Sequence, residues 1–150
     1  MSHATVPFIC FLGLFAALSN AQQNKPNLSG KWQLNTGKSE LHSGIPYAVN
    51  LAIDQKGSAI HVVRTARTSA GKDTVTEFNC TTDGKDCDVK GAKISLWYDG
   101  ASLVEMDIAG ESVTKSSMTL SDDGKTISID VNHISPSGDR EKLVLEKSGA

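Results

Sequence analysis

The sequence lacks the features that mark several large functional classes. Its 150 residues carry a net charge of −2 without a cluster of Lys or Arg, which argues against binding to nucleic acid or to anionic membrane surfaces. No His or Cys pair has the spacing of metal ligands, and neither a Gly-x-Ser-x-Gly elbow nor a Gly-rich phosphate loop is present. We therefore expect no metal, no cofactor and no enzymatic activity.

Long hydrophobic runs are limited to Val6–Leu18, which is too short to span a bilayer as a helix. Ser19-Asn20-Ala21 follows, with small residues where signal peptidase needs them, so residues 1–21 are expected to be a signal peptide. Because no Lys or Arg precedes the run, a short membrane anchor is the alternative. After cleavage we expect a secreted or periplasmic monomer away from the membrane, with an N-terminal arm at 22–29 and one domain at 30–147.

Cysteine is scarce, and its placement predicts one disulfide. Cys10 lies in the predicted signal peptide, which leaves Cys80 and Cys87 in the exported chain. An even number of cysteines in an oxidising compartment favours a disulfide. Asp83-Gly84 suits a two-residue type I′ turn, which would place the two cysteines directly opposite each other and within bonding reach.

Other turn signals divide the chain into short hairpins. Asp123-Gly124 and Lys56-Gly57 suit two-residue turns, whereas Ser69-Ala70-Gly71, Pro136-Ser137-Gly138 and Tyr98-Asp99-Gly100 suit three-residue turns that end in Gly. The strand pairs that these turns predict are Leu120 with Ile127, Met118 with Ile129, Ile53 with Ile60, Leu51 with Val62, Ala66 with Thr74, Val62 with Phe78, Val131 with Leu143, Ile129 with Leu145, and Ile94 with Val104.

The regular spacing of these hairpins predicts the fold class. The exported chain has no amphipathic helical window of useful length, and short strands separated by turn signals indicate an all-β sandwich or barrel. Sequential hairpins favour a meander, whose closure removes its edges. We expect a closed antiparallel up-and-down barrel of eight to ten strands, at 30–35, 47–54, 59–68, 73–82, 85–90, 93–97, 101–107, 111–121, 126–135 and 139–147.

The expected registers place one set of side chains on a common inner face. Its apolar members are Trp32, Leu34, Val49, Leu51, Ile53, Ile60, Val62, Phe78, Ile94, Leu96, Val104, Met106, Met118, Leu120, Ile127, Ile129, Val131, Leu143 and Leu145. Its polar members are Arg64, Thr74, Thr76, Thr114, Ser116 and His133. Such a face fits either a filled core, which we favour, or an apolar pocket with polar anchors.

Arg64 is the most informative single residue, because a buried guanidinium needs a paired anion. That anion could be a ligand carboxylate, with Thr74 and Thr76 as hydroxyl donors nearby. Met106 and Met118 would then lie along the ligand's apolar tail. The alternative is that Arg64, late in its strand, reaches water at the barrel mouth.

The remaining chemistry-bearing residues have plainer interpretations. Glu105 and Asp107 are expected on an outer strand face, where carboxylates usually serve as solvated charges rather than as an acid–base pair. His42, His61 and His133 are expected on the surface or at a barrel end.

Gly30-Lys31-Trp32 resembles the Gly-x-Trp signature of the lipocalin and avidin superfamily, in which the Trp plugs one end of the barrel. The resemblance implies that Trp32 is buried and that Arg140 stacks on its ring, as a cation–π contact. Fatty-acid-binding proteins are similar in their ten-stranded meander, but the gap at residues 36–46 is too short for their helical pair. The two tryptophans of the exported chain, Trp32 and Trp97, are too few for an avidin biotin site.

The nearest resemblance is to small exported bacterial proteins of the kind abundant in acidobacteria, a lipocalin-like group without an assigned activity. It rests on the segments 32–39, Asp123-Gly124-Lys125-Thr126 and Leu145-Glu146-Lys147. Two functions remain open. The first is binding of a small hydrophobic, amphipathic or fatty-acid-like molecule inside the barrel. The second is a protein-interaction barrel with a filled interior, such as a periplasmic protease inhibitor.

Overall fold

A computed structural model describes residues 25–42, 48–68 and 70–149. The predicted signal peptide and the first residues of the arm lie outside these ranges. Within the described ranges, ten strands follow one another, as expected, with one 3₁₀ turn, η1, at Thr36–Lys38. The strands are β1 Gly30–Leu34, β2 Ala48–Lys56, β3 Ala59–Arg67, β4 Asp73–Thr81, β5 Asp83–Val89, β6 Ala92–Asp99, β7 Ser102–Ala109, β8 Ser112–Leu120, β9 Thr126–Ser135 and β10 Glu141–Lys147.

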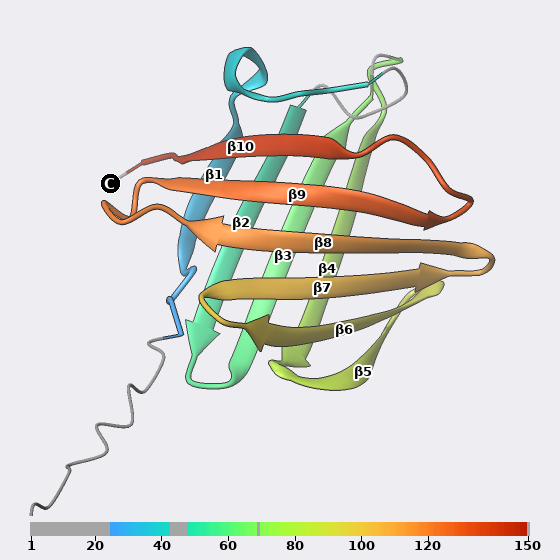
Figure 1. Cartoon of the computed structure of the whole chain (residues 1–150), viewed down its shortest axis with the longest axis horizontal. Coiled ribbons are helices and arrows are strands. Elements are labelled where there is room, and N and C mark those ends of the chain that lie inside the picture. Colours follow the sequence, from blue (N-terminus) through green and yellow to red (C-terminus); the bar gives the residue numbers. More distant parts are fainter. Residues whose placement is uncertain (1–24, 43–47, 69, 150) are drawn as a thin grey trace, which may run out of the picture.

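The strands form one antiparallel sheet that curls into a nearly closed barrel, which confirms the predicted fold class. The order is β4-β3-β2-β1-β10-β9-β8-β7-β6-β5, so β1 and β10 pair and join the two ends of the chain. Strands β1 to β4 run steeply behind the flatter layer of β6 to β10 (Figure 1). Strands β4 and β5 are the two edges of the sheet, and no ladder joins them. The interior therefore lies between two crossed layers.

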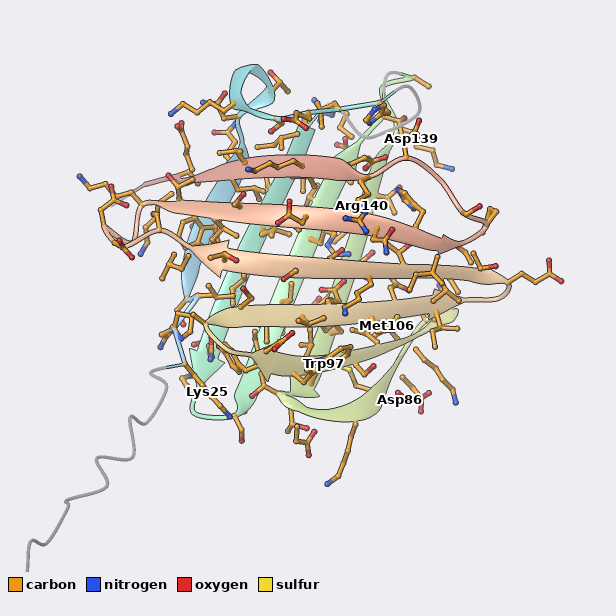
Figure 2. The ribbon with its side chains drawn as sticks, in the orientation of Figure 1. Lys25, Asp86, Trp97, Met106, Asp139 and Arg140 are labelled. Atoms are coloured by element: carbon orange, nitrogen blue, oxygen red, sulfur yellow. A yellow bond between two sulfur atoms is a disulfide. The ribbon has the colours of Figure 1, made fainter. Side chains whose placement is uncertain are left out.

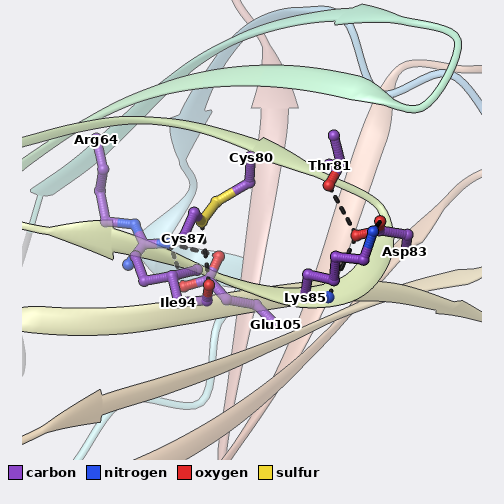
Figure 3. The surroundings of a disulfide bond; sticks show 8 residues. All are labelled: Arg64, Cys80, Thr81, Asp83, Lys85, Cys87, Ile94 and Glu105. Carbon is purple, nitrogen blue, oxygen red and sulfur yellow. Dashed lines mark hydrogen bonds and ion pairs between the residues drawn. A yellow bond between two sulfur atoms is a disulfide. The ribbon is translucent and has the colours of Figure 1, made fainter.

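The disulfide lies at these two edges. Cys80 of β4 and Cys87 of β5 are bonded, as predicted, with their Cα atoms 5.6 Å apart (Figure 3). The expected hairpin ladder between them is wrong, because β5 pairs with β6 instead and is bulged near Asp83. The disulfide thus links the two sheet edges, β4 and β5, which no hydrogen-bonded ladder joins.

The turns differ in type from the prediction. No described residue other than glycine has a positive φ, whereas a type I′ turn needs two such residues. In the β2–β3 hairpin the turn is Gly57-Ser58, with Gly57 at a φ of 62°, as in type II′. Ile53 therefore faces Val62, and Leu51 faces Arg64. The shift is two residues, so the same side chains still point inward.

The other registers are partly as predicted. Leu120–Ile127, Met118–Ile129, Ala66–Thr74 and Val62–Phe78 are confirmed. In the β9–β10 hairpin the prediction is wrong by two residues, and the observed pairs are Val131–Glu141, Ile129–Leu143 and Ile127–Leu145. The ladder ends at the Val131–Glu141 pair, and β10 begins only at Glu141.

The predicted register of the β6–β7 hairpin is wrong in the way that most affects the interior of the barrel. β6 continues to Asp99, and the turn is Gly100-Ala101, with Gly100 at a φ of 60°. Ile94 therefore faces Asp107 rather than Val104. The register is shifted by three residues, an odd number, and the shift therefore exchanges the inner and outer faces of β7.

Leu103, Glu105 and Asp107 consequently share the inner face with the buried residues of β6, because directly paired residues lie on the same side of a sheet. Val104 and Met106, predicted to point inward, point outward. Val104 is nevertheless buried, since it lies opposite Trp97 on the outer face (Figure 2).

The core fills one end of the barrel. Trp32 is 1% exposed and its Nε1 donates to the carbonyl of Leu28, which is fully buried. The predicted burial of Trp32 is confirmed, but its cation is Lys147, whose Nζ lies 5.2 Å from the ring centroid. Arg140 is wrong as the stacking partner, because Lys147 is paired with Trp32 in the ladder whereas Arg140 precedes the opposite end of β10.

Candidate functional site

A cavity of about 200 Å³ lies inside the barrel, between the two layers. Aliphatic side chains from β2, β8, β9 and β10 line most of its wall, and polar side chains occupy the rest. The lining residues are Val49, Leu51, Arg64, Ala66, Thr114, Ser116, Met118, Ile129, Val131, Glu141 and Leu143. The interior is thus not completely filled, and the wall has the apolar-with-few-polar composition of small-molecule sites.

The N-terminal segment closes the end of the barrel away from the cavity. The Gln55 side chain accepts from the backbone N–H of Leu28 at 3.1 Å and donates to the Tyr98 hydroxyl at 2.8 Å. That hydroxyl donates to the carbonyl of Pro26 at 2.7 Å. These hydrogen bonds satisfy the polar groups at this end of the barrel, so the N-terminal segment covers it stably. The cavity lies toward the other end, where β3 leads to the turn at Gly71 and β9 leads to Pro136.

Arg64 lies in the wall of the cavity and already has an anionic partner. Its Nη2 donates to both carboxylate oxygens of Glu105, at 2.7 and 2.9 Å. The Glu105 side chain is 4% exposed and that of Arg64 is 28% exposed, so the pair lies across the interior from β3 to β7 (Figure 3). The nearby carboxylate raises the pKa of Arg64. The prediction that Glu105 lies on an outer face is therefore wrong. Glu105 instead supplies the anion that the Arg64 guanidinium requires.

Asp107 adds a second inward carboxylate two residues further along β7. It lies directly opposite Thr114, which lines the cavity. Its Oδ1 is buried and has no hydrogen-bond partner. Burial raises the pKa of Asp107, and the charge of Glu105 raises it further, against a smaller opposite effect of Arg64. Asp107, too, was wrongly predicted to be a solvated surface charge.

The rim carries a third carboxylate. Glu141 lines the cavity, and its Oε1 lies 3.3 Å from Nε2 of His133. His133 faces Thr114 across the β8–β9 ladder, and its side chain is 37% exposed. The expectation that His133 lies at a barrel end is met. The cavity therefore combines an aliphatic wall with a polar side formed by Arg64, Thr114, Ser116 and Glu141. Glu105, Asp107 and His133 do not line the cavity, but each is paired with or faces a residue that does.

The structure brings together some of the predicted ligand-contacting residues and not others. Arg64 and Met118 line the cavity. Thr76 faces Arg64 in the β3–β4 ladder and Thr74 faces Ala66, so both belong to the inner face but lie beyond the lining. Met106 belongs to the outer face of β7. Ligand contact by any of them stays a prediction.

Sequence reasoning missed Glu105, Asp107 and Glu141 as inward residues. The sequence offered one signal, which was that a buried Arg64 requires an anion. That signal did not indicate which carboxylate would pair with it. For the ranges 25–42, 48–68 and 70–149, the structure contains no group of three or more His, Cys, Asp or Glu arranged to hold a metal ion. Within the same ranges, no helix has the length and apolarity to cross a membrane.

Comparison with known proteins identifies the fold. No protein-family model matches the sequence, and no curated protein matches it. Similar solved structures include wild-type fluorescent protein UnaG, with 18% identity, a TM-score of 0.58, and coverage of 80% of this chain and 96% of UnaG. Fatty-acid-binding protein 1 of Echinococcus granulosus has 14% identity and a TM-score of 0.58, covering 81% of this chain and 97% of that protein.

Secretory abundant heat soluble protein 4 of Ramazzottius varieornatus has 17% identity and a TM-score of 0.61, covering 83% of this chain and 96% of that protein. At these identities the likeness concerns the fold alone. The neighbours are barrels of the fatty-acid-binding-protein and lipocalin type, and the present chain has the same architecture with a short 3₁₀ turn after its first strand.

Proposed function

We propose that this barrel binds a small hydrophobic ligand in the cavity between β2–β3 and β8–β10. The observation that carries the proposal is the cavity itself, an apolar space inside a barrel whose structural neighbours include a fatty-acid-binding protein. A filled interior would have supported the protein-interaction alternative, which the open space disfavours. One of the structural neighbours is a fatty-acid-binding protein, and we expect this chain to bind rather than to catalyse.

The volume limits the size of the ligand. The cavity measures about 200 Å³, below the ~300–1,000 Å³ of typical drug-sized sites. A long acyl chain extended past Val62 and Phe78 would need space that these buried residues occupy. We therefore expect a compact ligand whose apolar part contacts Leu51, Met118 and Leu143.

The setting of this function follows from predictions that are still open. Export of a monomer by a bacterial cell, with residues 1–21 removed, is one of them. The Cys80–Cys87 disulfide supports the export alone, because structural disulfides form and persist in oxidising compartments. The sequence also predicts a fatty-acid-like ligand whose carboxylate meets Arg64, although Glu105 already occupies part of that guanidinium.

A calorimetric titration with hexanol tests the proposal. Hexanol carries no charge and is compact, so saturable binding with a negative heat-capacity change is expected. Ala66→Phe places a ring in the cavity and should abolish binding. Ala59→Phe is the matched control, because Ala59 is exposed at the start of β3 and outside the cavity. Absence of saturable binding to the unaltered protein, or equal binding by both variants, would refute the proposal.

A further inference from the structure

The charges around the cavity bear on which ligands fit. Glu105, Asp107 and Glu141 contribute three carboxylates, whereas Arg64 and His133 contribute one guanidinium and one imidazole. The Arg64–Glu105 pair neutralises itself through two short hydrogen bonds. Glu141 has His133 as its neighbour. Asp107 is the remaining carboxylate: it feels the charge of Arg64, but its Oδ1 has no hydrogen-bond partner.

Asp107 also has an unmet hydrogen-bonding need. Its Oδ1 is shielded from water and accepts no hydrogen bond. Leaving a buried acceptor unsatisfied is unfavourable, and more so for a charged group than for a neutral one. Thr114, directly opposite Asp107 in the β7–β8 ladder, lines the cavity, so Asp107 belongs to the same inner face as the lining and neighbours it.

From these two observations, the cavity and the unpartnered oxygen beside it, we infer that the preferred ligand is a small aliphatic or aromatic amine whose ammonium group is directed to Asp107. The inference rests on the proposed binding function and specifies the ligand class. An ammonium group donates hydrogen bonds and opposes the excess negative charge. A ligand carboxylate would do neither, since the Arg64 guanidinium is already bound by Glu105, His133 lies beside Glu141, and Asp107 and Glu141 add two further carboxylates nearby.

A matched series of ligands tests the inference on the unaltered protein. Hexylamine, hexanol and hexanoate share one tail and differ in head group, so their dissociation constants compare a cation, a neutral donor and an anion at the same site. We expect hexylamine to bind more tightly than hexanol by roughly ten- to one-hundred-fold, the range of a charge-assisted hydrogen bond. Hexanoate should bind more weakly than hexanol.

Asp107→Asn assigns the preference to one side chain. The substitution keeps the shape of the side chain and removes its charge, so the hexylamine-to-hexanol ratio should fall toward unity while hexanol binding persists. Asp130→Asn is the matched control, because Asp130 is exposed on the outer face of β9. It should leave the ratio unchanged.

The outcomes separate this inference from the binding function beneath it. Tightest binding by hexanoate, equal binding by all three ligands, or an amine preference that survives Asp107→Asn would overturn the amine inference while leaving a binding barrel. Failure of all three ligands would overturn both. If Asp107→Asn does not fold, the order of the three ligands on the unaltered protein still decides whether an amine is preferred.

Discussion

The buried ion pair between Arg64 and Glu105 provides the sharpest quantitative prediction. Arg64→Met removes the guanidinium that pairs with Glu105, a carboxylate whose side chain is 4% exposed. Removing one partner of a buried pair generally destabilises by about 3–5 kcal/mol, because the other charge stays buried and unpaired. Arg64 itself is 28% exposed, which places the expected loss at the lower end, about 3 kcal/mol.

Glu105→Gln should be less costly. The amide oxygen can still accept from the guanidinium, and Arg64 is close enough to the barrel mouth to reach water, so we expect a loss of about 1 kcal/mol. The double variant has no buried unpaired charge. Its loss should be about 2 kcal/mol, smaller than the sum of the single losses, which corresponds to a coupling of about 2 kcal/mol.

Urea unfolding of the four proteins measures this coupling, with the emission of the buried Trp32 as the signal. The exposed pair Lys38–Glu146 is a suitable control, since its side chains are 62% and 44% exposed and its Lys38→Met and Glu146→Gln variants should be additive. Additive losses for Arg64→Met and Glu105→Gln, within about 0.5 kcal/mol, would show that the two side chains do not depend on each other in solution.

Three further predictions concern the closed end, the open edge and the acidic wall. Trp32→Ala should lower the free energy of unfolding by about 3–5 kcal/mol, the loss for large aromatic truncations in cores, and a urea-unfolding loss below 1 kcal/mol would make Trp32 peripheral. Replacing Cys80 and Cys87 by Ala should lower it by roughly 2.5 kcal/mol, from the chain entropy of the closed loop; two free thiols by mass spectrometry of unreduced protein would remove this expectation. Burial raises the pKa of Asp107 in the folded protein. As pH rises, the unfolded chain therefore loses this proton at a lower pH than the folded protein does, and the free energy of unfolding decreases over that range. Asp107→Asn should therefore gain stability relative to the unaltered protein as pH rises from about 4, through the unfolded carboxyl pKa, toward neutrality, and a pH-independent difference in urea midpoint would contradict this.

The sequence was sufficient for the architecture because hairpins are local. Ten strands, their chain order and the inward burial of Trp32 follow from turn signals and alternation, and an error of two residues in a turn leaves the inner face intact. The Gly57 and Pro136 hairpins show this: both registers differ from expectation, yet Ile53 and Ile129 remain in the core.

The site was less predictable because β7 reverses the usual pattern. Its outward residues include Val104, Met106 and Ile108, whereas its inward residues include Glu105 and Asp107. Hydrophobicity therefore favours the wrong face, and only the position of the turn at Gly100 corrects it. The polar wall depends on pairing across the barrel between Arg64 and Glu105, which are 41 residues apart and which no local pattern connects.

The lack of a β4–β5 ladder was also beyond a local prediction. Asp83-Gly84 has the sequence of a tight hairpin, but β5 pairs with β6 and forms no ladder with β4. The curvature of the entire sheet decides whether its two edges meet. The disulfide was predictable because the cysteines needed only to be close, and it joins the edges that the backbone leaves unpaired.

The central claim is that the cavity inside the barrel is a binding site, and an NMR titration of uniformly ¹⁵N-labelled protein with hexanol tests it most directly. We predict saturable shifts of the amide signals of Ala66, Ser116 and Leu143, which line the cavity, with one dissociation constant for all three. The amide of the exposed Asp130, on the outer face of β9, should not move with the same dependence. Shifts confined to the outer face, or no saturable shifts at all, would contradict the claim.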